Sequence, residues 1–319
     1  MYLAAEMHNS IHWIEVRLTT DGESAEALAD VLGRFVSKGV VIESITRFNP
    51  RTEENEPTGG VAVVGYLAAD EHLEGKRRQL EEALWHLGQI TPIPQPDFTP
   101  IQDQNWMAAW QQHYHPVPLG EHILVMPAWI EPDQGESRNV VRIDPALAFG
   151  TGTHPSTQLC LRLLEQHLQP REAVIDVGCG SGILSIAALK LGASHALAVD
   201  TDSQAVRATR ENAAINQLSP EQLEAGQGSV KEILAGQFSI QQAPLVVVNI
   251  LAKVIINLLE GGLAGLVEQG DGTLLLSGIL TDQVDNVLRT AQEAGFSLFE
   301  QLRDGDWVSL AMKKHSPHL

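Results

Sequence analysis

The sequence predicts an α/β protein with a mainly parallel sheet and helices on both faces, preceded by a smaller α+β unit. Three observations support this prediction. From about Val117 onward, short apolar runs alternate with helical stretches, which is typical of a sheet built from β-α-β units. The glycine-rich stretch GCGSG, residues 178–182, directly follows one of these runs. Residues 1–102 instead show the order β-α-β-β-α-β.

The first 102 residues are predicted to form a ferredoxin-like α+β domain, because their elements follow the split βαβ order. Apolar patterning indicates strands at 11–18, 40–48, 61–67 and 97–102. Helices are expected at 24–37 and around Leu73 to Leu87, where apolar residues recur on one face. The polar stretch 49–60 is predicted to be an exposed loop. No catalytic cluster is visible here, so docking or scaffolding is the expected function.

A proline-rich segment separates this unit from the rest of the chain. Prolines stand at positions 92, 94, 96 and 100, and a short helix is expected at 104–113 with Trp106 and Trp110 one turn apart. The predicted domains are therefore 1–102, a linker helix and turn at 103–120, and a main domain at 121–319.

The main domain is predicted from its alternating elements. Strands are expected at 174–178, 195–200, 244–249 and 272–278, with helices at 183–192, 205–216, up to 266, and 281–294. The last two strands, 296–302 and 307–312, are joined by a turn containing Asp304 and Gly305, which indicates a hairpin. At least one late strand therefore runs antiparallel to the others.

Composition narrows the class of protein. The net charge is −19, from 40 acidic and 21 basic residues, and such a surface repels nucleic acid but suits basic partners. Two cysteines, Cys160 and Cys179, are too few for a disulfide framework or a cysteine zinc cluster. No signal peptide or membrane-length apolar run is present in the sequence. We expect a cytoplasmic monomer with no metal, no membrane contact and no direct nucleic-acid binding.

The GCGSG stretch predicts a site for a nucleotide-like ligand. Gly178 and Gly180 follow a strand and open a helix, where glycine lets the backbone approach a ligand closely. Asp200 ends the next strand, where its carboxylate can accept both ribose hydroxyls. The dinucleotide fingerprint is incomplete, because its third glycine position falls on Ile183. The stretch resembles instead the first motif of S-adenosylmethionine-dependent methyltransferases, and the late hairpin resembles their seven-strand, Rossmann-like sheet.

Asn249 is the candidate catalytic residue, because PLVVVN places it at the carboxyl end of a buried strand. Methyl transfer to nitrogen needs a neutral amine, and deprotonation at pH 7 costs roughly 4–5 kcal/mol for a lysine but about 1 kcal/mol for an α-amino group. An amide oxygen can accept an N–H of the neutral amine and orient its lone pair, whereas a carboxylate favours the charged ammonium. Thr157 is expected in a first helical turn after Pro155, with its hydroxyl facing whatever the preceding glycine-containing loop, FGTGT, covers.

Several motifs together resemble one family, the methyltransferases that modify protein eleven of the large ribosomal subunit. They are NWMAAWQQHYHPVPLG, DPALAFGTGTHPST, DVGCGSGILSIAALKLGA, VDTDSQAV with TRENAAIN, and VVVNILA, in that order. The resemblance implies S-adenosylmethionine as cofactor and N-methylation of lysine and α-amino groups of a ribosomal protein. It assigns cofactor positions to Thr157, Gly178, Gly180, Asp200 and Asn249, with Asn249 shared by the target nitrogen. It also implies that residues 1–102 dock the substrate.

Three other functions remain open at this point. The first is methylation of a base amine in nucleic acid, which the acidic composition disfavours. The second is a nicotinamide oxidoreductase, disfavoured by the missing third glycine. The third is a non-catalytic module with a methyltransferase-like fold, disfavoured by the intact GCGSG and NILA motifs.

Overall fold

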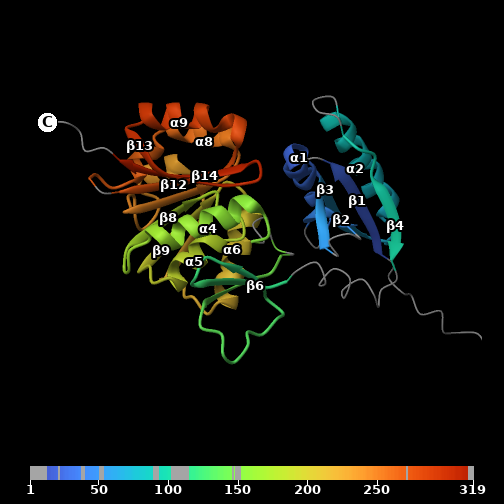
Figure 1. The fold of residues 1–319 in the computed structure, drawn as a ribbon, viewed down its shortest axis with the longest axis horizontal. Helices are drawn as coiled ribbons and strands as arrows, with labels where there is room; N and C mark the ends of the chain where they lie inside the picture. The colour runs from blue at the N-terminus through green and yellow to red at the C-terminus, as the bar shows by residue number, and fades with distance from the viewer. Residues whose placement is uncertain are drawn as a thin grey trace, which may run out of the picture. The chain divides into compact units, whose positions relative to one another are not determined.

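The computed structural model describes residues 13–20, 22–36, 40–49, 54–88, 93–101, 115–145, 147, 152–270 and 272–314. The chain divides into two compact units, Met1–Tyr114 and His115–Leu319. Each has its own sheet and helices (Figure 1). The helix expected around Trp106 and Trp110 lies outside the described residues.

The described part of the first unit contains six elements, in the predicted order. They are β1 (Trp13–Thr20), α1 (Gly22–Gly33), β2 (Val40–Asn49), β3 (Glu54–Ala68), α2 (Leu73–Gly88) and β4 (Asp97–Ile101). The four strands form an antiparallel sheet in the order β2-β3-β1-β4. Its core contains Leu18 of β1, Leu28 and Leu32 of α1, and Leu80 of α2, all fully buried. Burial of each such side chain contributes about 1.5–3 kcal/mol.

One prediction for this unit is wrong. The stretch 49–60, expected to be a loop, is a strand from Glu54 onward, because β3 begins there. Its backbone pairs with β2 as far as Asn49 opposite Glu54. Strand pairing uses main-chain donors and acceptors, so a polar sequence without alternation can still extend a hairpin.

The second unit is built on a seven-stranded sheet. Its strands are β8 (Ala173–Val177), β9 (His195–Asp200), β10 (Leu223–Gln227), β11 (Leu245–Asn249), β12 (Thr273–Leu280), β13 (Phe296–Asp304) and β14 (Trp307–Lys314). Their order is β10-β9-β8-β11-β12-β14-β13. Neighbours from β10 to β12 pair in parallel, whereas β14 is antiparallel to both β12 and β13. The predicted seven-strand sheet with a late antiparallel hairpin is confirmed.

Helices cover both faces of this sheet (Figure 1). One layer contains α4 (Pro155–His167), α5 (Ile183–Lys190) and α6 (Ser203–Ile215), and the other contains α7 (Val230–Leu234), α8 (Ala252–Glu260) and α9 (Val284–Glu293). Successive side chains of β11 point to opposite faces of the sheet, so this strand contributes to both cores. Val247 packs in one core, and Val246 and Val248 pack in the other. Two 3₁₀ turns, Leu263–Leu266 and Thr281–Gln283, complete the connections.

A small sheet that the sequence analysis did not identify precedes α4. It contains β5 (Val117–Leu119), β6 (Ile123–Pro127) and β7 (Asn139–Ile143), in the order β5-β6-β7. Val117–Leu119, which the sequence predicts to lie in the linker, instead pairs with β6 in the second unit. The buried residues Ile123, Val125 and Val141 join the core beside α4 and α5. This packing places the end of β7 against α6.

None of the helices described here combines the length and apolar character needed to cross a membrane. Within the same part of the chain, no three histidine, cysteine or acidic side chains are grouped so that they could hold a metal ion.

Candidate functional site

The loop between β8 and α5 holds three glycines in the left-handed region of backbone conformation. The φ angles are +80° at Gly178, +53° at Gly180 and +79° at Gly182, values that residues with a side chain rarely adopt. Two of these positions are also crowded. A Cβ atom at Gly178 would lie 2.6 Å from Cγ2 of Ile250, and one at Gly182 would lie 2.7 Å from Cγ2 of Thr209. Both space and backbone conformation therefore select glycine in the tight turn after β8.

Asp200 ends β9, and two main-chain donors fix its carboxylate. Gly180 donates its N–H to Oδ2 at 3.1 Å, and Asp202 donates its N–H to Oδ1 at 3.0 Å. The residue is only partly buried, and each carboxylate oxygen retains acceptor capacity. The geometry therefore leaves Asp200 able to accept two hydroxyl groups from a ligand.

Thr157 and Asn249 come together from separate elements. Thr157 lies in the first turn of α4 and is only 3% exposed, and Asn249 is the last residue of β11. Asn249 donates a hydrogen bond from Nδ2 to Oγ1 of Thr157 at 3.3 Å. Within the described part of the chain, Oδ1 of Asn249 accepts no hydrogen bond. The amide oxygen is therefore the part of Asn249 left for a ligand or substrate.

The sheet order explains why these side chains meet. Strand β8 lies between β9 and β11, and all three are parallel, so their carboxyl ends share one edge of the sheet. Ile250, the residue after Asn249, lies against Gly178. The predicted site residues from the glycine loop, β9, β11 and α4 are thus brought to one edge.

Asp176, the acid of the glycine motif, is completely buried in β8. Ser185 donates its hydroxyl to Oδ2 at 2.7 Å, whereas Oδ1 is buried and has no hydrogen-bond partner among the residues that the structure describes. Burial raises the pKa of this carboxyl to about 7, against the opposing effect of the Ser185 bonds, and the charge of Asp200 adds to the increase. An unpaired buried acceptor two residues before Gly178 fits a ligand that carries N–H donors.

The first turn of α4 is held by groups that sequence reasoning did not identify. His154 caps the helix, because its side chain accepts from the Ser156 N–H at 3.3 Å and lies 2.8 Å from the Ser156 hydroxyl. Burial lowers the pKa of His154 to about 4, so the imidazole is neutral at neutral pH. From the sheet side, Ser277 donates its hydroxyl to the Ser156 carbonyl at 2.8 Å. The available signal was a side-chain acceptor directly before Pro155.

Cys179, although inside the glycine loop, has the properties of a packing group. Its thiol is buried and lies 3.3 Å from the Thr209 hydroxyl. Burial, followed by the charge of Asp176, raises the pKa of the thiol well above its usual value. A thiolate nucleophile would need the opposite shift.

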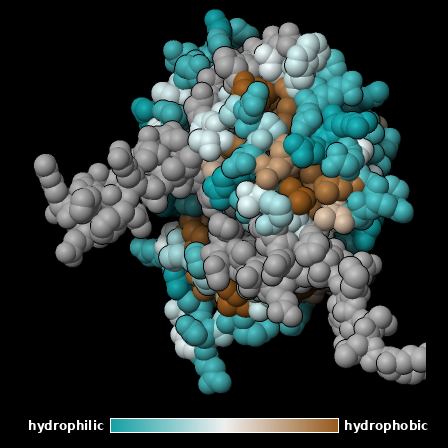
Figure 2. Space-filling view, turned by 90° about the vertical axis from the view of Figure 1, so that its right-hand side faces the viewer, coloured by the Kyte–Doolittle hydropathy of each residue, from teal (hydrophilic) through white to brown (hydrophobic). Residues whose placement is uncertain are grey.

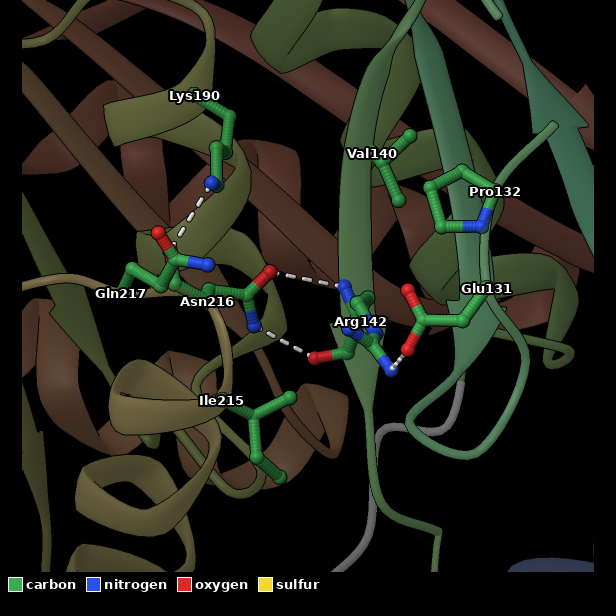
Figure 3. A pocket seen from close by; sticks show the side chains of 8 residues that line it. All are labelled: Glu131, Pro132, Val140, Arg142, Lys190, Ile215, Asn216 and Gln217. Carbon is green, nitrogen blue, oxygen red and sulfur yellow. Dashed lines mark hydrogen bonds and ion pairs between the residues drawn. The ribbon is translucent and has the colours of Figure 1, made fainter. Parts of the chain in front are cut away.

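A cavity of about 220 Å³ lies between β7 and the C-terminal ends of α5 and α6 (Figure 3). Its lining residues are Glu131, Pro132, Val140, Arg142, Lys190, Ile215, Asn216 and Gln217. None of the predicted site residues lines it. Glu131 accepts from the Arg142 guanidinium at 2.9 Å, and Lys190 donates to the Asn216 carbonyl at 3.0 Å.

Known proteins resemble this chain along nearly its whole length. The family model described as ribosomal protein L11 methyltransferase (PrmA) matches residues 12–315. A ribosomal protein L11 methyltransferase of Chloroflexus aurantiacus is 35% identical over an aligned length of 324 residues. The alignment covers 95% of this chain and 98% of that protein. A ribosomal protein L11 methyltransferase of Listeria monocytogenes is 34% identical over an aligned length of 319 residues. That alignment covers 95% of this chain and 99% of the Listeria protein.

A solved structure agrees with these relatives. The crystal structure of a ribosomal protein L11 methylase from Lactobacillus delbrueckii subsp. bulgaricus is 34% identical and superposes with a TM-score of 0.55. The match covers 63% of this chain and 100% of that chain.

The family match and the identity over nearly full length decide between the functions left open by the motifs. They favour neither an oxidoreductase, nor a nucleic-acid enzyme, nor a non-catalytic module. The chain is a protein N-methyltransferase with S-adenosylmethionine as its methyl donor. It belongs to the ribosomal protein L11 methyltransferase family.

Proposed function

We propose that this enzyme methylates amino groups of ribosomal protein L11, including lysine side chains and the α-amino group. The observation that carries the proposal is the pairing of Asn249 with Thr157 beside the glycine loop. It leaves a neutral amide oxygen, rather than a carboxylate, at the edge of the sheet. An amide oxygen accepts from a neutral amine without stabilising its protonated form.

Four residues are proposed to bind the cofactor together with Asn249. Asp200 accepts the ribose hydroxyls, while Gly178 and Gly180 present main-chain groups to the methionine end. Thr157 positions Asn249 through the hydrogen bond to its amide. S-adenosylmethionine, when bound, supplies an electrophilic methyl group. The buried Asp176 oxygen and the fixed Asp200 carboxylate support this assignment, because the cofactor carries both N–H and hydroxyl donors.

Asn249 is the proposed catalytic residue. Its Oδ1 accepts an N–H bond from the neutral target amine and thereby directs the nitrogen lone pair, which is an orientation effect. The amine has to lose a proton before transfer, at a cost of about 1 kcal/mol for an α-amino group and roughly 4–5 kcal/mol for a lysine at pH 7. No side chain is assigned as a general base, so the proton passes to water.

The first unit is the proposed docking domain for the substrate protein. It carries a separate core and contributes none of the five site residues. A net charge of −19 favours a basic partner such as a ribosomal protein and disfavours nucleic acid. We also propose that the enzyme acts as a monomer in the cytoplasm, where ribosomal proteins are made.

The test is a methyl-transfer assay with the full chain and S-adenosylmethionine carrying a labelled methyl group. Purified L11, total ribosomal protein and ribosomal RNA are offered separately, and mass spectrometry locates the label. Label on lysine and N-terminal nitrogens of L11 supports the proposal, and Asn249→Ala serves as the inactive control. Label confined to RNA, or to other proteins, would refute it.

A further inference from the structure

One face of α6 binds main chain rather than apolar side chains. Thr209 and Asn212 of α6 and Asn216, the residue that caps its C-terminal end, are spaced i, i+3 and i+7, so they lie on one side of the helix. All three are buried, with exposed fractions of 0%, 0% and 4%. Buried polar side chains are destabilising unless they form hydrogen bonds. The partners of these three side chains therefore indicate their purpose.

Two of the three bind the glycine loop. Thr209 donates its hydroxyl to the Gly180 carbonyl at 3.0 Å, and Asn212 donates from Nδ2 to the Ser181 carbonyl at 2.9 Å. The loop has left-handed glycines on both sides of Ser181, and glycine gives the unbound backbone unusual freedom. These two side chains therefore restrain a segment that its own sequence leaves flexible.

The same helix face also binds the free edge of β7. Asn216 accepts from the Arg142 N–H at 2.9 Å and donates to the Arg142 carbonyl at 2.6 Å (Figure 3). Asn212 accepts on Oδ1 from the Asp144 N–H at 2.9 Å. Strand β7 pairs with β6 on its other edge. The two asparagine amides thus take the place of a neighbouring strand.

Asn212 differs from Asn216 because its amide joins two segments. Its Nδ2 binds the glycine loop and its Oδ1 binds the residue after β7. Among the described residues, the Asn216 amide forms hydrogen bonds with the Arg142 main chain and the Asn212 carbonyl only. The loop position in turn affects Asp200, because Gly180 donates its N–H to that carboxylate. A shift of the loop would therefore move the Asp200 carboxylate.

We infer that Asn212, assisted by Thr209, is a positioning residue that sets the glycine loop against β7 and so determines the affinity for S-adenosylmethionine. The inference rests on the proposed cofactor role of the glycine loop and Asp200. It assigns a task to the TRENAAIN stretch, which contains all three side chains.

The test measures S-adenosylmethionine binding by calorimetry on the full chain. Asn212→Ala should weaken binding by about tenfold or more, because two buried partners lose a hydrogen bond and the loop is released. Thr209→Val, which keeps the side-chain shape, should weaken it by roughly three- to tenfold. Asn216→Ala is the matched control and should stay within about threefold of the parent, because its partners lie outside the loop.

Kinetics and thermal unfolding distinguish positioning from general stability. Asn212→Ala should raise the KM for S-adenosylmethionine while kcat at saturation stays within about twofold, since Asn249 and Thr157 are unchanged. If Asn212→Ala and Asn216→Ala lower the melting temperature alike and neither alters cofactor affinity, the inference is overturned. If Asn212→Ala does not fold, Thr209→Val decides, and unchanged affinity in that variant overturns the inference.

Asp200→Ala separates this inference from the proposed site. Weaker binding in Asp200→Ala, with normal binding in folded Asn212→Ala and Thr209→Val, would overturn only the positioning role. Unchanged binding in Asp200→Ala would overturn the cofactor assignment and, with it, the inference that depends on it.

Discussion

At the scale of single residues, Asp200 gives the simplest test of the cofactor site. Its carboxylate is oriented by two main-chain donors and remains partly exposed. Hydrogen bonds to a charged acceptor contribute about 1.5–3 kcal/mol. We therefore expect Asp200→Ala to weaken S-adenosylmethionine binding by roughly 10- to 150-fold in calorimetry. Unchanged affinity in a variant with a native circular dichroism spectrum would contradict the ribose assignment.

Asn249 separates orientation from cofactor binding. Asn249→Ala is expected to lose most of the methyl-transfer rate. In Asn249→Asp the carboxylate stabilises the protonated target amine, so the rate deficit should shrink as the pH rises toward about 9. Initial rates on L11 from pH 7 to 9 measure this. A deficit independent of pH would restrict Asn249 to the cofactor or to the local turn with Thr157.

Asp176 predicts a pH dependence of stability. Burial raises its pKa from 3.8 to about 7, so the folded state binds a proton that the unfolded state releases between these values. The free energy of unfolding is therefore highest with respect to this group below about pH 4. It falls as the pH rises from about 4 to about 7, and the group causes no further change above about pH 7. Asp176→Asn removes this slope and should gain stability relative to the parent by up to roughly 4 kcal/mol across that range.

Urea unfolding without cofactor at pH 5 and pH 8 checks the Asp176 prediction. The difference in unfolding free energy between Asp176→Asn and the parent should favour the variant more at pH 8. Equal differences at the two values would show that Asp176 titrates near its ordinary pKa in the folded protein.

Much of the site could be predicted from sequence, because its residues stand at strand ends and helix starts. Asp200 and Asn249 end apolar runs, and Thr157 follows Pro155 at the start of α4. The supporting shell could not be predicted. The contact from Ser277 to the Ser156 carbonyl joins residues 121 positions apart, and no local pattern encodes such a pairing.

At the scale of elements, Gly278 of β12 lies against the main chain of Ile250, the residue after Asn249. Gly278 has φ +81°, and a Cβ atom there would lie 2.3 Å from the Ile250 carbonyl oxygen. Gly295 has a similar φ of +89° with no atom within 4 Å. Gly278→Ala should therefore lose at least about 2 kcal/mol of stability and much methyl-transfer activity, whereas Gly295→Ala should lose about 1 kcal/mol, the cost of the left-handed backbone alone.

Urea unfolding and single-turnover methyl transfer compare the two glycine variants. Equal destabilisation in both would show that Ile250 moves aside without cost, and that the bulge between β12 and β14 is not needed to place Asn249.

Elements with strong apolar patterns were predicted, and those without them were not. The central strand β11 is Leu-Val-Val-Val-Asn and is recognisable at once, whereas β10 is Leu-Glu-Ala-Gly-Gln at the edge of the sheet. Edge position reduces the need for large apolar side chains, so only Leu223 and Ala225 of β10 are buried. The start of β3 in the first unit was missed for a different reason. Its polar stretch pairs with β2 through main-chain hydrogen bonds, which need no apolar side chains.

At the scale of the whole molecule, the two units differ in the proposed site residues that they contribute. All five proposed site residues lie in His115–Leu319, whose two cores enclose both faces of the sheet. On the face shown in Figure 2, hydrophilic residues surround smaller hydrophobic patches. Methyl transfer at the sheet edge involves few atoms of a protein substrate, so we propose that a second surface, on the first unit, selects L11 among many proteins with free amines.

Removal of the first unit tests whether that unit docks the substrate while the second unit binds the cofactor. A fragment of residues 105–319 keeps Thr157, Gly178, Asp200 and Asn249, and should bind S-adenosylmethionine within about threefold of the full chain. It should methylate intact L11 at least about tenfold more slowly, because docking raises the effective concentration of target amines. A short peptide with the same α-amino group should react equally with fragment and full chain, since it is too short to contact a separate docking surface. Circular dichroism must show a folded fragment, and a folded fragment that methylates intact L11 at the full rate would make the first unit structural or regulatory.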